Sequence, residues 1–129
     1  MLIEGSQIDW GGHNNDADYI IEEVKDFDKA IGVALDFAEK DGNTLVIVTA
    51  DHETGGFTLA SHKKSDNDGN MVNDYNHIEP SFSTKGHSAT LIPLFAYGTR
   101  SSEFCGIYEN TEIFVKILNL LKKENSLRL

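Results

Sequence analysis

One apolar stripe dominates the first part of the chain. Apolar residues recur at steps of three and four positions between residues 20 and 38, and charged residues occupy the opposite side. This spacing predicts an amphipathic helix. Asn15 or Asp16 can cap its start, and Gly42 suits its end. The stripe consists of Ile20, Val24, Phe27, Ile31, Ala34, Leu35 and Ala38.

Short apolar runs on either side of this helix predict strands. The segment 44–49 contains a continuous aliphatic run, Leu45–Val48, which is typical of a strand buried on both faces. Leu2–Ile8 predicts a second strand, followed by a loop over 10–15 that is rich in Gly and Asn. Strand, helix and strand in this order predict a right-handed βαβ unit with parallel strands. The expected fold class is therefore α/β, with three layers, α/β/α, around a mostly parallel sheet.

The second half of the chain has a less regular pattern. A brief strand is predicted at 57–60, whereas the polar segment 61–85 lacks a helical period and predicts an irregular excursion. Ala89–Tyr97 predicts another strand, in which Pro93 favours an edge position or a bulge. A final amphipathic helix is expected from residue 110 or 111 onward. With 129 residues, the chain 1–129 is expected to hold one domain at most.

Charge and composition narrow the choice of partners. The net charge of −10 argues against nucleic acid and anionic membranes, which need a basic face. No apolar stretch approaches the roughly 18 residues of a membrane span. A phosphate substrate stays compatible with the acidic chain if bound metal cations reverse the local field.

Candidate metal ligands gather where the predicted strands end. Ligands are expected beyond the carboxyl ends of strands in open α/β sheets. The pair Asp51-His52 follows the 44–49 strand, and it could be a metal pair, an acid/base pair or a polar strand terminus. Zinc takes imidazole nitrogen and carboxylate oxygen, so Asp9, His13 and His87 could hold one ion and the pair a second. The full candidate set is Glu4, Asp9, His13, Asp51, His52 and His87.

Three motifs give the chain a resemblance to a known family. They are EGSQIDWGGH at 4–13, TADHETGG at 49–56 and GHS at 86–88. Together they resemble the C-terminal part of an alkaline phosphatase, and segment 61–85 matches that pattern least. The resemblance implies a partial alkaline-phosphatase-like core and hydrolysis of phosphate monoesters.

The resemblance also implies a role for each candidate ligand. The family residues that match Asp9, His13 and His87 bind the first zinc ion. Those that match Asp51 and His52 contribute to the second zinc ion. The glutamate that matches Glu4 belongs to a magnesium site. The physical chemistry agrees, because two cations about 4 Å apart can clamp both oxygens of an in-line phosphoryl displacement, and magnesium favours carboxylates and retained waters.

Other parts of the family pattern have no match in this sequence. The family's serine nucleophile, an aspartate shared by two metals and a phosphate-gripping arginine come from its N-terminal part. We therefore expect a C-terminal fragment with no catalytic nucleophile, a partial second zinc site and negligible phosphate ester hydrolysis by itself. The chain starts inside what reads as a strand and carries no signal peptide, which also suggests a piece of something longer.

Alternative functions remain open from sequence. The wider superfamily includes phosphodiesterases, phosphomutases and sulfatases with a similar set of metal ligands. The sequence EGSQID, which begins at Glu4, favours a phosphatase. A non-catalytic metal-binding module is a further alternative, since the nucleophile is missing. The resemblance implies a periplasmic or extracellular parent protein. A homodimer is compatible with exposed sheet edges, which favour self-association.

Overall fold

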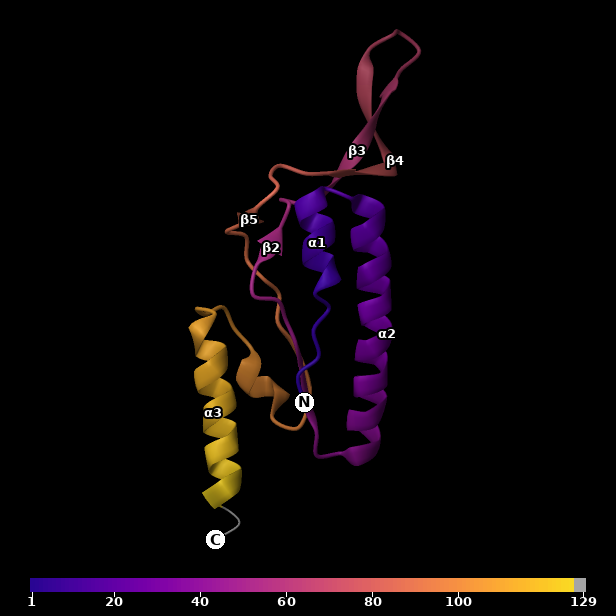
Figure 1. Cartoon of the computed structure of the whole chain (residues 1–129). Helices are drawn as coiled ribbons and strands as arrows, with labels where there is room; N and C mark the ends of the chain where they lie inside the picture. The colour runs from indigo at the N-terminus through magenta and orange to yellow at the C-terminus, as the bar shows by residue number, and fades with distance from the viewer. Residues whose placement is uncertain (127–129) are drawn as a thin grey trace. The chain divides into compact units, whose positions relative to one another are not determined.

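The computed structural model describes residues 1–126, and this part of the chain forms two compact units. The first unit contains Met1–Asp28 and His52–Leu91, and the second contains Lys29–Asp51 and the chain from Ile92 onward. The chain contains both helices and strands, as the expected α/β class requires. In chain order the elements are α1 (Gln7–Asn14), α2 (Ala17–Asp41), β1 (Leu45–Val48), β2 (Glu53–Thr54), β3 (Thr58–Ser65), β4 (Met71–Ser81), β5 (His87–Ser88), β6 (Phe95–Gly98), η1 (Ser101–Phe104) and α3 (Thr111–Ser126) (Figure 1).

The predicted strand Leu2–Ile8 and the predicted loop 10–15 are both wrong. Helix α1 begins at Gln7 and runs through the Gly-rich segment to Asn14. It ends in a Schellman motif, in which the N–H groups of Asn15 and Asp16 donate to the carbonyls of Gly12 and Gly11, 3.0 Å in each case. Asn15 adopts the left-handed conformation that this motif needs, with φ of 55°.

Two glycines explain why a helix forms where composition indicated a loop. A Cβ at Gly11 would lie 2.9 Å from the side chain of Ile20 in α2, and a Cβ at Gly12 would lie 2.8 Å from Thr54 in β2. Only glycine permits these approaches, so tertiary packing outweighs the poor helix propensity of glycine. Helix α1 therefore packs against the first turns of α2 and against β2 (Figure 1).

The long central helix is close to its prediction. Asp16 caps the start of α2 by accepting a hydrogen bond of 3.0 Å from the N–H of Tyr19. At the other end, the N–H of Gly42 donates to Ala38 at 2.9 Å, and φ of 69° at Gly42 ends the helix.

The segment 61–85 is mostly regular, which corrects the expected irregular excursion. Strands β3 and β4 pair antiparallel from Thr58↔Ser81 to Ser65↔Met71, with a register shift between Ser61 and His62. The turn is organised by Asp66, whose carboxylate accepts the N–H groups of Asp68 and Asn70. The result is a twisted two-stranded hairpin (Figure 1).

The predicted parallel pairing of 2–8 with 44–49 is also wrong. In the second unit, β1 pairs antiparallel with β6, from Leu45↔Gly98 to Val48↔Phe95. The predicted strand Ala89–Tyr97 is reduced to β6, which begins two residues after Pro93, and Thr49 Oγ1 donates to the Pro93 carbonyl at 3.3 Å. Each sheet in the described part of the chain has two antiparallel strands, so the parallel three-layer arrangement is not seen there.

Helix α3 begins at Thr111, as the apolar spacing predicts. Phe104 of η1 and Leu120 of α3 are buried in the second unit. Tyr108 donates a hydrogen bond of 2.9 Å to the Phe104 carbonyl, and Lys116 lies over the Tyr108 ring. None of the helices within residues 1–126 has the length and apolar character needed to cross a membrane.

Candidate metal centre

Two of the candidate ligands come from one face of α1. Asp9 and His13 are four residues apart, a spacing that places side chains above one another on a helix. The His13 Nε2 atom lies 3.5 Å from Asp9 Oδ2. Both side chains remain about 40% exposed, 42% for His13 and 39% for Asp9. A solvated ion could therefore reach them.

The third candidate comes from strand β5. His87 pairs with Thr54 of β2, and Ser88 pairs with Glu53. The Glu53 carboxylate accepts the N–H groups of Gly56 and Phe57 and the Ser88 hydroxyl. Glu53 thereby joins the 53–57 turn to β5, which holds His87 beside α1.

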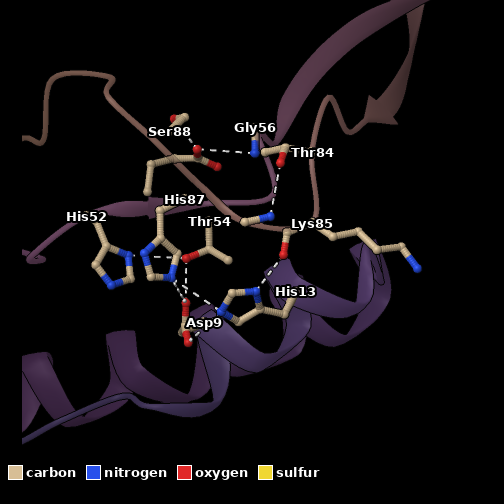
Figure 2. Close-up of polar contacts among 11 residues, drawn as sticks. Asp9, His13, His52, Thr54, Gly56, Thr84, Lys85, His87 and Ser88 are labelled. Atoms are coloured by element: carbon tan, nitrogen blue, oxygen red, sulfur yellow. Dashed lines mark hydrogen bonds and ion pairs between the residues drawn. The ribbon is translucent and has the colours of Figure 1, made fainter.

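The three side chains converge, as Figure 2 shows. His87 Nε2 lies 3.3 Å from His13 Nε2 and 3.8 Å from Asp9 Oδ1. Two donor atoms bound to zinc at about 2.0–2.1 Å with tetrahedral geometry lie about 3.4 Å apart. The two imidazole nitrogens, 3.3 Å apart, are close to that value. The Asp9 carboxylate lies near both, with Oδ2 at 3.5 Å from His13 and Oδ1 at 3.8 Å from His87. One carboxylate and two imidazoles also form a donor set that suits zinc.

A backbone carbonyl sets the orientation of the His13 ring. His13 Nδ1 lies 2.6 Å from the Lys85 carbonyl oxygen, which can only accept, so Nδ1 carries the proton. The lone pair of the neutral ring is then on Nε2, the atom that faces His87. Metal-binding histidines characteristically have such a partner on the other nitrogen. The Asn15 amide, oriented to satisfy both of its polar atoms, donates to the Thr84 carbonyl at 2.8 Å and fixes this loop to α1.

His52 lies directly against this group but outside the three-residue cluster. Its ring stacks on His87, with centroids 3.5 Å apart and planes inclined by 16°. Asp51 belongs to the other unit, and Glu4 is exposed in the segment before α1. In the described part of the chain, Asp9, His13 and His87 form the only group of three His, Cys, Asp or Glu side chains close enough to share an ion. The second zinc position and the magnesium position thus stay predictions.

Residues that the sequence did not single out as ligands support the group. Thr54 of β2 donates its hydroxyl to Asp9 Oδ1 and lies 3.3 Å from His52 Nδ1. The carbonyl of Lys85 and the carboxylate of Glu53 hold His13 and β5. No periodicity signals such contacts; only the position of Thr54 two residues after His52 points toward the site.

Comparisons with known proteins agree with the motif resemblance. A family model described as "Alkaline phosphatase" matches residues 1–73. "Alkaline phosphatase 4" of Bacillus subtilis is 37% identical over 113 residues, covering 88% of this chain and 23% of the relative. The alkaline phosphatase of Escherichia coli is 34% identical over 126 residues, covering 88% of this chain and 26% of the relative.

A solved structure is more similar still. It is a mutant of the TAB5 alkaline phosphatase with magnesium bound in its M3 site. The match has a TM-score of 0.85 and 69% identity, and it covers 92% of this chain and 34% of the other. The chain thus spans about a quarter to a third of the length of these proteins.

Proposed function

The chain belongs to the alkaline phosphatase family, and we propose that it supplies the metal-binding part of a zinc- and magnesium-dependent phosphate monoester hydrolase. The observation that carries this proposal is the convergence of Asp9, His13 and His87, whose spacing suits a single zinc ion. The carbonyl of Lys85 supports the same role, because it directs the lone pair of His13 toward the group.

The remaining candidates extend the proposal to a site with several metals. Asp51 and His52 contribute to a second zinc ion, and Glu4 contributes to a magnesium ion. When bound, two such cations stabilise the attacking and leaving oxygens of an in-line phosphoryl transfer. The residues of this chain hold and orient these ions: Asp9 offers a carboxylate oxygen, and His13 and His87 each offer an imidazole nitrogen.

The complete enzyme needs more than this chain in our proposal. We assign the nucleophile, the shared aspartate and the phosphate-gripping arginine to the remainder of an alkaline phosphatase, because this chain spans 34% of the TAB5 structure. The parallel, three-layer sheet and a homodimer also belong to the whole protein, which acts in the periplasm or outside the cell. The 129-residue chain by itself hydrolyses phosphate esters negligibly.

A chimera tests the proposal. This chain replaces the equivalent third of the TAB5 enzyme, to which it is 69% identical. We expect zinc-dependent hydrolysis of p-nitrophenyl phosphate, and a loss of at least about 100-fold with His87→Ala because a metal ligand is removed. His62→Ala is the matched control and keeps the activity, since His62 pairs with Glu79 in the hairpin.

Three results would contradict the proposal. One is full activity in the His87→Ala chimera. Another is a preference of the chimera for bis-p-nitrophenyl phosphate or p-nitrophenyl sulfate, which favours a phosphodiesterase or sulfatase. The third is zinc binding without any hydrolysis by the chimera, which favours a non-catalytic metal-binding module.

A further inference from the structure

Thr54 lies between two candidate ligands that the sequence assigns to different metal ions. Its hydroxyl donates to Asp9 Oδ1, on the first site, and lies 3.3 Å from Nδ1 of His52, on the second (Figure 2). All three residues belong to the same compact unit. One hydroxyl group is therefore in contact with both sets of ligands.

The number of hydrogens that Thr54 can donate determines the direction of its hydrogen bonds to Asp9 and His52. A threonine hydroxyl has one hydrogen to donate, and an ionised carboxylate can only accept. The hydrogen of Thr54 is directed to Asp9, so His52 must donate from Nδ1 to the Thr54 oxygen. A neutral His52 with its proton on Nδ1 has its lone pair on Nε2. The same logic applies to His13, whose Nδ1 donates to the Lys85 carbonyl.

The packing of Thr54 can be separated from its hydrogen bonds. The methyl and Cβ of Thr54 lie against Gly12, where an added Cβ would be 2.8 Å from both atoms. Backbone groups pair β2 with β5, with Thr54 opposite His87. Valine at position 54 retains this shape and loses the hydroxyl, whereas serine retains the hydroxyl and loses the methyl.

We propose that Thr54 is a positioning residue whose hydroxyl orients Asp9 and selects the Nδ1–H tautomer of His52, so that one group prepares ligand atoms for both metal positions. This inference rests on the proposed function, because it assigns Asp9 and His52 to neighbouring ions. This positioning role differs from a structural role of Thr54. The backbone pairing with β5 and the packing of the methyl group against Gly12 provide the structural role, and neither needs the hydroxyl.

The first test needs no metal. Long-range proton–nitrogen correlation spectra of the 129-residue chain, recorded at alkaline pH where imidazoles are neutral, report which ring nitrogen of His52 is protonated. We expect Nδ1–H in the wild type and in Thr54→Ser, and a shift toward Nε2–H in Thr54→Val. An Nε2–H tautomer in the wild type, or an unchanged tautomer in Thr54→Val, would overturn the inference. Unchanged amide signals of β2 and β5 verify that Thr54→Val is folded.

The second test measures zinc affinity by competition with a chelator. Loss of a residue that supports a metal ligand typically weakens affinity by about 10–100-fold, which is our expectation for Thr54→Val, with recovery in Thr54→Ser. Wild-type affinity in Thr54→Val, together with loss of binding in His87→Ala, would overturn this inference and leave the proposed function intact. No zinc binding by the wild type would overturn both.

Discussion

The carboxylate of Asp74 is buried in a hairpin that is otherwise largely exposed. The Asp74 residue has 6% of its surface exposed, and its carboxylate accepts hydrogen bonds from His77 Nδ1 at 2.9 Å and from the N–H of Asn76 at 3.1 Å. Lys64 Nζ lies 3.3 Å away. These contacts, the one from His77 first, lower the pKa of Asp74 to about 2. The ionised form is thus bound by partners from both strands.

This depressed pKa predicts an acid-sensitive hairpin. An unfolded aspartate has a pKa of about 3.9, so the folded state binds fewer protons at acidic pH. The contribution of Asp74 to stability is fully present above about pH 4 and is lost as the pH falls through about 2. Amide exchange of β3 and β4 should accelerate across this window, and Asp74→Asn should remove the step. A carboxyl resonance of Asp74 that titrates near pH 4 would contradict this account.

At the residue scale, the sequence pointed to three side chains that converge in the structure, whereas their metal-binding role stays a prediction. Asp9, His13 and His87 could be selected because zinc takes carboxylate and imidazole ligands, and they lie together. Thr54 and the Lys85 carbonyl could not be selected in the same way. Their roles arise from β2 and the 84–86 loop approaching α1, and such contacts between distant segments leave no periodic pattern in the sequence.

At the scale of elements, the packing of helix α1 against β2 depends on the absence of a side chain at Gly12. Gly12 faces Thr54 so closely that a Cβ would lie 2.8 Å from three of its atoms. Around Gly32, in the middle of α2, no heavy atom other than those of its chain neighbours and the adjacent helix backbone lies within 4 Å of the Cβ position. Both glycines therefore lie in helices, but Gly12 is tightly packed and Gly32 has free space at its Cβ position.

This contrast predicts that a glycine-to-alanine substitution has different effects on stability at positions 12 and 32. Gly32→Ala should stabilise the chain by up to about 1 kcal/mol, because alanine favours the helix. Gly12→Ala gains the same propensity but forces β2 away, at a cost of about 1–3 kcal/mol, so it should be neutral to destabilising and should displace Thr54. Urea unfolding followed by circular dichroism measures both variants. Equal stabilisation by both would refute the packing role of Gly12.

Elements with a clear apolar pattern were predicted, and the others were predicted only in part or not at all. The stripe of α2, the start of α3 and the aliphatic run of β1 are each visible in the sequence. The β3–β4 hairpin buries little except Asp74, so it lacks the two-residue alternation of a half-buried strand. The aliphatic run of β1 identified a strand but did not specify its partner or direction, which here is antiparallel β6.

At the scale of the whole molecule, the candidate site is concentrated in one of the two units. Asp9, His13, His52, Thr54 and His87 all belong to the unit formed by Met1–Asp28 and His52–Leu91. The three-residue group is therefore defined within that unit. Because the chain covers 23% to 34% of the relatives, metal binding is the part of the proposed function to test on this chain alone.

A zinc-binding isotherm on the purified chain, beside His87→Ala and the hairpin variant His77→Ala, tests the central claim most directly. We predict that wild type and His77→Ala bind tightly with about one zinc ion per chain, and that His87→Ala loses this binding because one of three protein ligands is removed. His77 contacts Asp74 in the hairpin, which makes it a suitable control. No zinc binding by the wild type, or equal binding by His87→Ala, would contradict the account.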